Sequence, residues 1–454
     1  MSKLLDRIRR PIARARRDQA IRLGPLSVVR SALFARVLER MRDAEAKLYG
    51  GDTVPYAYDG RKDRRSVVFL HHSYYNFYYL ARALRARGWD AISVSLEAPD
   101  GPHAAFYHGE DVNLFDPDPQ RFLSNITEFF RTVPDRFRMV QFYGRGHMSF
   151  FPTRFDHSME FDAIPSDFLL LRQRGVKIGY TVSGCLDGVA QSSVHRWSGG
   201  ACDRCVWQNN PAVCSDRGNL AWGHKVRMFC DLFATEGFPA LDYQDGPVCF
   251  REPLTSALDQ EFWRPDLEIP SQYRLHREPG ELIVYHAVGN FDLRSVGGRN
   301  LKGTGAVVAA IERLRSEGVK VRLEFVKDIP NREVRFIQAQ ADVIVDQLNY
   351  GRYGATAREA MMLGKPTICN INRNEPRPEA RLRSIEECPL IFADEESIYP
   401  VLKGLLGDAD RRRQIGAASR AFAVKWHSAE ACAARFETVY DCLMAGERPV
   451  AEVA

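Results

Sequence analysis

The sequence predicts an α/β protein built from doubly wound, parallel sheets. Short apolar runs, such as residues 66–70 and 343–345, have the length of buried strands, and amphipathic helical patterns follow them. Glycines, including Gly88 and Gly364, stand where these helices are expected to end. This alternation favours βαβ units. A chain of 454 residues is long enough for two or more domains, each with its own core.

The first domain is predicted at residues 59–265. Its strands are expected at 66–70, 89–94, 138–143, 177–182, 232–234 and 247–250, and a long loop at 99–119. Ligands of such sheets lie beyond the carboxyl ends of the strands. His72, His147 and Asp187 each follow a predicted strand, so we expect them at the edge of the sheet where a ligand binds. For His72 a structural role is the alternative.

The second domain is predicted at residues 281–428, after a polar, proline-bearing linker at 266–280. Its strands are expected at 282–285, 321–326, 343–345, 367–369 and 390–392. The first of them leads into a basic loop that is rich in glycine. Fixed cations in a glycine-rich loop suit the phosphate groups of a ligand. The candidate residues of the loop are Gly289, Arg294, Arg299, Lys302 and Gly303, with either arginine as the partner of the lysine.

A second glycine loop, residues 351–354, separates the apolar run 343–345 from a predicted helix at 355–363. Backbone N–H groups at such a helix start are aimed at an anion. Glu359 lies one turn into the helix, where a carboxylate suits a ribose diol rather than a phosphate.

The motif Gly351-Arg-Tyr353-Gly354, followed by Glu359-Ala-Met-Met-Leu-Gly-Lys-Pro366, resembles the donor-site signature of family-4-type retaining glycosyltransferases (glycosyl transferases group 1). The resemblance implies the GT-B fold, in which two Rossmann-like domains face an interdomain cleft. It also implies that the C-terminal helix, residues 429–446, packs back on the first domain. In that family a first glutamate stands eight positions before the second, where this chain has Gly351.

The resemblance assigns the donor to the second domain and the acceptor to the first, on the side of His72, His147 and Asp187. It implies that Glu359 contacts the ribose and that Arg299 and Lys302 contact the diphosphate. Such cations suit a diphosphate leaving group, because negative charge grows on the β-phosphate when its bond to the sugar breaks. The backbone amides of Gly354 and Ala355 would contact donor phosphate or sugar. The further expected donor contacts are Gly289, Arg294, Gly303, Gly351, Tyr353 and Thr356.

The implied activity is sugar transfer from a UDP- or GDP-type donor to a carbohydrate or lipid-linked acceptor, with retention, in the synthesis of cell-surface polysaccharide or glycoconjugate. No cofactor is expected to be required, since the loop cations and the helix start already neutralise the leaving group. Gly351 and Ser183, which stands where relatives carry a histidine, leave open a degenerate, non-catalytic binding or scaffold protein. A sugar-nucleotide epimerase on the same fold is a third possibility.

The long polar stretch 188–219 is expected to form a loop, and it contains a cysteine cluster. Cys202 and Cys205 have the Cys-x2-Cys spacing that lets two thiolates reach one zinc ion, and Cys214 follows nine residues later. Cys185 or His195 would supply the fourth ligand of a structural zinc. The alternatives are reduced, unligated cysteines and a redox role.

The basic charge of the chain is concentrated at its start. Residues 1–47 contain thirteen Lys or Arg and five Asp or Glu, so they carry +8, and because the whole chain carries +5 the remainder carries −3. Residues 1–58 are expected to form a basic, helical segment that either binds an anionic membrane surface or remains a solvated arm or docking segment. Nucleic-acid binding is not expected, because aromatic residues are sparse there. No secretory signal or membrane span is predicted, which places the protein in the cytoplasm, free or peripheral on the inner membrane face.

Overall fold

The computed structural model describes residues 65–70, 74–101, 108–145, 148–151, 166–237, 242, 248–289, 291–327, 329–373 and 381–447. Residues 1–58, His72 and His147, which carry predictions made above, lie outside the described residues.

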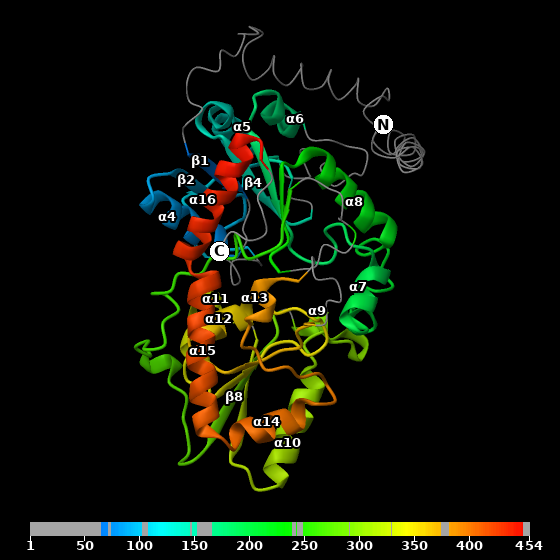
Figure 1. Ribbon diagram of the computed structural model, residues 1–454, viewed down its shortest axis with the longest axis vertical. Coiled ribbons are helices and arrows are strands. Elements are labelled where there is room, and N and C mark those ends of the chain that lie inside the picture. Colours follow the sequence, from blue (N-terminus) through cyan, green and yellow to red (C-terminus); the bar gives the residue numbers. More distant parts are fainter. Residues whose placement is uncertain are drawn as a thin grey trace.

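The larger sheet lies in the upper half of Figure 1 and has seven parallel strands in the order β3-β2-β1-β4-β5-β6-β7. Helices cover both of its faces. The strands are β1 (Ser66–Leu70), β2 (Asp90–Ser95), β3 (Val112–Asn113), β4 (Met139–Tyr143), β5 (Lys177–Thr181), β6 (Leu232–Ala234) and β7 (Val248–Phe250). The helices are α4 (Asn76–Ala86), α5 (Pro119–Arg136), α6 (Ser166–Gln173), α7 (Gln191–Ser198), the 3-10 turn η2 (Ala201–Arg204) and α8 (Asp216–Phe229).

The smaller sheet lies in the lower half of Figure 1 and has four parallel strands in the order β11-β10-β8-β9. These strands are β8 (Leu282–Ala287), β9 (Val321–Val326), β10 (Val343–Val345) and β11 (Thr367–Ile368). The helices are α9 (Phe291–Arg294), η4 (Val296–Gly298), α10 (Thr304–Ser316), α11 (Asn331–Gln338), α12 (Ala355–Met362), α13 (Arg383–Glu386), α14 (Ile398–Leu406), α15 (Ala409–His427) and α16 (Ala429–Ala445).

Alternate residues of the central strands enter different cores. In β1, Val67 and Phe69 belong to one hydrophobic cluster, whereas Val68 and Leu70 belong to another on the opposite face. The strands of the smaller sheet divide in the same way between two further clusters. Because both faces of each sheet are covered, the strands need apolar residues throughout, which explains the continuous apolar runs. The predicted α/β fold with two doubly wound, parallel sheets is confirmed.

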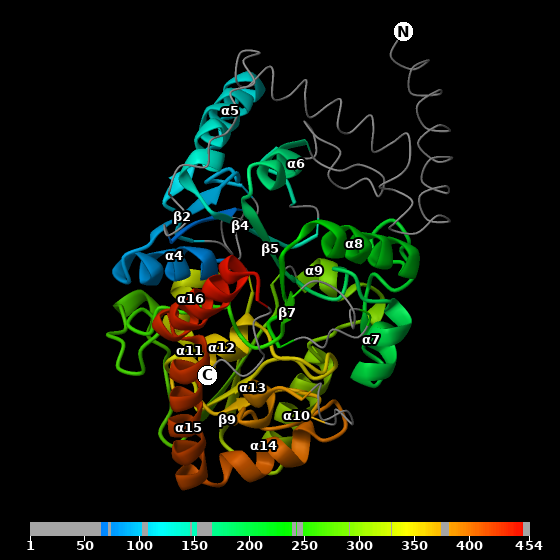
Figure 2. The same ribbon diagram turned by 45° about the horizontal axis from the view of Figure 1, so that its top comes forward.

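Helices α15 and α16 form a nearly continuous column along one side of the molecule, orange to red in Figures 1 and 2. Helix α15 packs on α12 in the lower half, and α16 packs on α4 in the upper half. Phe436 of α16 lies 5.4 Å from Phe69 between ring centroids, and Tyr440 lies 4.6 Å from Trp89. The last helix thus completes the core of the first sheet.

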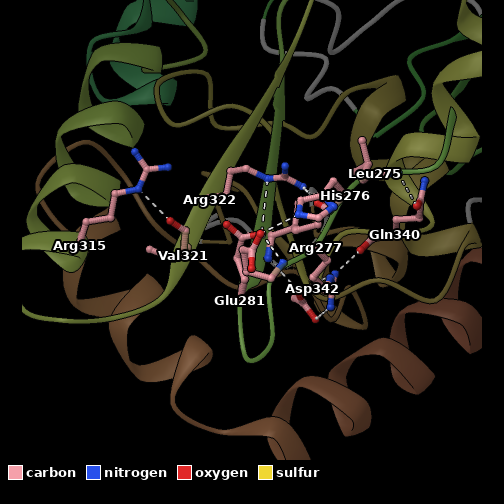
Figure 3. A network of polar contacts seen from close by, with 11 residues as sticks. Leu275, His276, Arg277, Glu281, Arg315, Val321, Arg322, Gln340 and Asp342 are labelled. Atoms are coloured by element: carbon pink, nitrogen blue, oxygen red, sulfur yellow. Dashed lines mark hydrogen bonds and ion pairs between the residues drawn. The ribbon is translucent and has the colours of Figure 1, made fainter. Parts of the chain in front are cut away.

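The second half of the segment between the sheets is fixed to the lower domain. Arg277 donates to the Gln340 carbonyl at 2.6 Å and pairs with Asp342 at 3.0 Å. Arg322 of β9 donates to the His276 carbonyl at 2.6 Å, and Gln340 accepts from the Leu275 amide at 2.9 Å (Figure 3). Rotation between the domains is therefore expected before residue 275 rather than after it.

Three local predictions are wrong. The stretch 188–219, expected as a loop, contains α7, η2 and the start of α8. The expected loop 99–119 contains the two-residue strand β3 at the sheet edge. The expected strand 390–392 is reduced to a single bridge from Ile391 to Ile368, because its neighbour β11 is only two residues long.

Within the part of the chain that the structure describes, no helix is long and apolar enough to cross a membrane.

Candidate functional site

A cavity of about 730 Å³ lies where the carboxyl ends of both sheets meet. The upper domain contributes residues at or beyond the carboxyl ends of β4, β5 and β6, including Tyr143, Ser183 and Glu236. The lower domain contributes the loop after β8, the loop after β10 and the start of α12. The carboxyl ends of parallel strands are where such sheets bind ligands, so this cavity is the candidate site.

Glu359 is buried at the floor of the cavity, with 2% of its surface exposed. Both of its carboxylate oxygens are occupied. Oε1 accepts from the Tyr75 hydroxyl at 2.6 Å and from Asn331 Nδ2 at 2.8 Å, and Oε2 accepts from Gln338 Nε2 at 3.3 Å. Burial raises the pKa of Glu359, against these three hydrogen bonds, which lower it. A ribose diol would have to replace one or more of the present donors.

Lys302 also lines the cavity, and its ammonium group pairs with Asp346. Asp346 is fully buried, and its second oxygen, Oδ2, accepts from the Gly354 amide at 3.0 Å. One carboxylate thus joins the loop after β8 to the start of α12. The Gly354 amide, which was expected to contact the donor, is already used by Asp346.

The other residues of the basic loop separate into two groups. Gly289 and Arg294 line the cavity, as Lys302 does. Arg299 is not among the described residues of the cavity wall, and it donates instead to the Cys205 carbonyl at 3.3 Å. Of the two arginines considered from the sequence, the structure therefore brings Arg294 to the cavity with Lys302.

Gly303 lies at the start of α10, outside the cavity wall. Its φ of +71° and its contact with Leu348, which a Cβ atom would approach to 2.9 Å, require a glycine there. The glycine allows the loop to pass close to Leu348, which lies between β10 and the second glycine loop.

His286 of β8 is hydrogen-bonded both to β10 and to Thr304, which follows the basic loop. Its Nδ1 faces the Val345 carbonyl at 3.0 Å, so Nδ1 carries the proton, and Nε2 accepts from the Thr304 hydroxyl at 2.9 Å. Asn300 donates to the same Thr304 oxygen at 3.0 Å. Complete burial lowers the pKa of His286 to about 4, so the imidazole is neutral. The network links β8, β10 and the loop that carries Lys302.

Gly351 is covered by the upper domain. The Trp197 ring would lie 3.3 Å from a Cβ atom at this position, and the φ of Gly351 is +78°. Asn372 donates to the Trp197 carbonyl at 2.7 Å and, through its amide, to the Gly351 carbonyl at 2.8 Å. A glutamate, which the family carries here, does not fit beside Trp197.

The other residues that were expected to contact the donor, Tyr353, Gly354, Ala355 and Thr356, all line the cavity. Asp187 does not. It is fully buried behind the cavity wall, where it accepts from the Ser183 hydroxyl at 2.8 Å and the Gly184 amide at 3.2 Å. Burial raises its pKa, which these hydrogen bonds oppose. In this structure Asp187 shapes the turn that presents Ser183 and Gly184.

The cysteines form a cluster on one wall of the cavity. Cys185, Cys202, Cys205 and Cys214 all line it, and each thiol is within electrostatic reach of the other three. Burial, followed by the neighbouring thiols, raises the pKa of Cys185 and of Cys202 to about 12. His195 faces Asp203 at 3.9 Å instead.

Among the described residues, no three His, Cys, Asp or Glu side chains are arranged so that they could hold a metal ion. A zinc ion at Cys202, Cys205 and Cys214 would therefore require the thiols to shift. It stays a prediction, which zinc analysis of the purified protein tests.

Four further residues of the site were not predicted from the sequence: Tyr75, Asn331, Asp346 and His286. Each lies far in sequence from the residue that it contacts, and only the folded sheets bring the partners together. A weak signal exists for Asp346 alone, because an acidic residue directly after a buried strand lies at the sheet's carboxyl edge.

The sequence matches no protein-family model, and a comparison with curated proteins gives no match. Solved structures do resemble the chain. A sucrose-phosphate synthase from Thermosynechococcus elongatus matches with a TM-score of 0.50 at 15% identity, covering 85% of this chain and 100% of that chain.

Two further structures match below a TM-score of 0.5. HepE from Anabaena in complex with UDP-glucose has a TM-score of 0.49 at 11% identity, with 83% of this chain and 99% of that chain covered. A putative UDP-N-acetylglucosamine 2-epimerase from Listeria monocytogenes has 0.45 at 11%, with 86% and 100% covered. The first match, together with the two sheets and the cavity between them, shows the GT-B fold.

Proposed function

We propose that the protein is a glycosyltransferase that moves a sugar from a nucleoside-diphosphate sugar to a carbohydrate or lipid-linked acceptor. The observation that carries the proposal is that Lys302, from the loop before α10, and Glu359, from helix α12, line one cavity between the domains. A cation for the leaving diphosphate and a carboxylate for the ribose are the two groups that a donor site of this kind needs.

In this proposal the donor nucleotide is of the UDP or GDP type. Lys302 and Arg294 bind the diphosphate and stabilise the charge that develops on it, which strengthens transition-state binding more than donor binding. The Ala355 amide contacts donor phosphate or sugar at the start of α12. Transfer with retention, without a metal cofactor, is part of the proposal and rests on the resemblance of the loop motif.

The proposed setting is the synthesis of cell-surface polysaccharide or glycoconjugate on the inner face of a membrane. Residues 1–47 carry +8 and interleave apolar residues, which suits adsorption to anionic lipid. Co-sedimentation of the full chain with vesicles that contain phosphatidylglycerol, against vesicles of phosphatidylcholine alone, tests this part separately from activity.

The experiment that tests the proposed function has two stages. A thermal-shift screen against UDP, GDP, ADP and CMP should identify one stabilising nucleotide. The corresponding sugar donors should then release that nucleoside diphosphate in the presence of an acceptor. Stabilisation by none of the four nucleotides would contradict the proposal.

Lys302→Ala should lower turnover by roughly two to three orders of magnitude, as the loss of one oxyanion donor does. The substitution also leaves Asp346 buried without its partner, so it destabilises the protein as well. The double variant Lys302→Ala/Asp346→Asn should recover much of the stability but none of the turnover.

Lys403→Ala is the matched control, because Lys403 is an exposed lysine that pairs with Glu317 and does not line the cavity. Turnover by the double variant at the wild-type rate would exclude the role of Lys302.

The alternative is a catalytically degenerate protein that binds a sugar or partner. Two observations favour it specifically: Trp197 stands where the family's first glutamate would point, and Tyr75 already occupies Glu359. Such a protein would bind a nucleotide or a glycan but release no nucleoside diphosphate from any donor.

A further inference from the structure

The cavity carries far more positive than negative charge. Its described lining contains seven cationic side chains and two carboxylates, Glu236 and Glu359. The cations are Arg145, Arg204, Arg294, Lys302, Lys327, Arg352 and Arg358. Lys302 pairs with Asp346, and Arg204 pairs with Glu395. Seven cations exceed what one diphosphate requires.

Arg358 has a buried guanidinium nitrogen without a hydrogen-bond partner. Among the described residues, no carboxylate lies within ion-pair distance of its guanidinium, and its buried Nε–H has no hydrogen-bond acceptor. It extends from the first turn of α12 into the cavity, among the phenols of Tyr75, Tyr143 and Tyr353. A buried guanidinium N–H without an acceptor is costly unless a ligand supplies one.

One carboxylate within electrostatic reach of Arg358 is already hydrogen-bonded elsewhere. Glu236 lies within electrostatic reach of Arg358, but its carboxylate accepts from the amides of Leu254, Thr255 and Ser256 and from the Thr255 hydroxyl. These four bonds hold Glu236 against the loop at 254–256. Its backbone has a φ of +54°, a conformation that is rare for residues other than glycine.

Arg352 and Arg145 line the same cavity as Arg358. Arg352 donates to the Glu236 carbonyl at 2.9 Å. Arg145 donates to the Val213 carbonyl and to Asn219 Oδ1, both at 3.1 Å, and its buried Nε–H also lacks an acceptor. Arg358 and Arg352 come from the lower domain but face residues that follow β4 and β6 of the upper domain. They are therefore separate from the loop that carries Lys302 and Arg294.

We propose that the cavity binds a second anionic group, a carboxylate or a phosphate, in addition to the donor diphosphate, and that Arg358 is its main ligand. This inference rests on the proposed function, in which the diphosphate of the nucleotide is the first anion. The second anion belongs either to the acceptor or to the transferred sugar, and the chemistry recognised is the same. A guanidinium group suits both anions, because it can donate to two oxygens of one carboxylate or one phosphate at the same time.

The test titrates inorganic phosphate into protein that is saturated with the nucleotide found by the thermal-shift screen. Calorimetry should show phosphate binding to the loaded protein without displacement of the nucleotide. Arg358→Gln should weaken phosphate binding by at least about tenfold, since a hydrogen bond to a charged group is lost, and leave nucleotide affinity nearly unchanged. Arg358→Lys, which retains the charge, should lie between the two.

Arg313→Gln is the matched control, because Arg313 is an exposed arginine of the same domain that pairs with Glu317 away from the cavity. Competition between phosphate and nucleotide in the wild-type protein would overturn the inference, and so would unchanged phosphate binding by a folded Arg358→Gln variant. If no nucleotide binds, the proposed function fails. Phosphate titration of the ligand-free protein and of Arg358→Gln then still decides whether Arg358 binds an anion.

Two donors distinguish the source of the anion. If it belongs to the transferred sugar, the glucuronate conjugate of the nucleotide should bind more tightly than the glucose conjugate, through Arg358, and should block phosphate. If it belongs to the acceptor, phosphate should bind together with either conjugate.

Discussion

Tyr75 reaches across the domain boundary and donates to Glu359, the carboxylate that is proposed to hold the ribose. Tyr75 is almost completely buried, and its ring lies against Tyr79, His108 and Trp263. A nucleotide that uses Glu359 must therefore compete with a hydroxyl of the protein itself. Affinity for the nucleotide depends on how easily this hydroxyl is displaced.

We expect Tyr75→Phe to bind the nucleotide more tightly, by about tenfold, because the ligand no longer displaces a hydrogen bond to a charged group. The ligand-free protein should be less stable, since Glu359 loses a partner. Calorimetric dissociation constants check this. Tyr79→Phe is the matched control, because the Tyr79 hydroxyl contacts His108 and not Glu359. Equal nucleotide affinity in Tyr75→Phe and wild type would mean that the ribose leaves Tyr75 in place.

His286 makes the stability of the donor domain sensitive to acid. Its pKa is lowered from 6.5 to about 4 by burial, so between these values the unfolded chain binds a proton that the folded protein does not. Stability from this group is complete above pH 6.5 and is lost as the pH falls towards 4. Between pH 7 and pH 5 the loss from His286 should be about 2 kcal/mol.

Denaturant unfolding of wild type and His286→Gln at both pH values measures this loss. The variant should be less stable at pH 7, and the difference should shrink at pH 5. The comparison is needed because burial raises the pKa values of Glu359, Asp187 and Glu252, which act with the opposite sign. A constant difference between the two proteins would show that His286 does not titrate in this range.

Individual site residues were predictable only where they belong to a local motif. Lys302 and Glu359 were identified because glycines and a helix start mark their loops. Their partners Asp346 and Tyr75 were not, because contacts between distant segments leave no spacing in the sequence. The assignment of Arg299 illustrates the same limit. The loop contains two arginines, and only packing against Cys205 decides which one is turned away from the cavity.

At the scale of elements, the buried strands were the most predictable feature. Strands β1, β6, β9 and β10 have the bounds expected from their apolar runs, since a sheet covered on both faces excludes polar residues from its centre. Helix α7 was missed because its sequence, QSSVHRWS, contains few strong helix formers. Tertiary contacts hold it, and Gly199 ends it with a φ of +69°, a glycine signal that was available in the sequence.

Helix α7 and the turn η2 also explain the departure at Gly351. The segment reaches from the upper domain to the lower one through Trp197, Arg204 and Cys205, whose contacts are with Gly351, Glu395 and Arg299. An element that the sequence suggested was a loop is therefore a wall of the cavity. The glycine in the motif and the helix that covers it form one arrangement, which neither motif nor periodicity reveals alone.

The whole molecule is held together by its C-terminal column. Helix α16 packs Phe436 and Tyr440 against two aromatic residues of the upper domain. These are Phe69 of β1 and Trp89, which directly precedes β2. Glu437 of the same helix pairs with Arg65 and Arg87 and accepts from the Trp89 indole at 3.2 Å. The upper domain is thus incomplete without the last part of the chain.

We expect Phe436→Ala to lower the free energy of unfolding by about 3–5 kcal/mol, as the loss of a large buried side chain does. Glu430→Gln, an exposed position on the same helix, is the control and should change it by less than about 0.5 kcal/mol. Denaturant unfolding monitored by tryptophan fluorescence checks both, since Trp89 lies against α16. A loss for Phe436→Ala no larger than that of the control would show that α16 does not complete the upper core.

The position of α16 has a consequence for how the protein folds during its synthesis. Strands β1 to β7 are synthesised before the second sheet, whereas the helix that covers Phe69 and Trp89 is synthesised after it. The core of the first domain therefore cannot be completed until α16 has left the ribosome. During that interval the nascent chain exposes an aromatic surface to which a chaperone can bind.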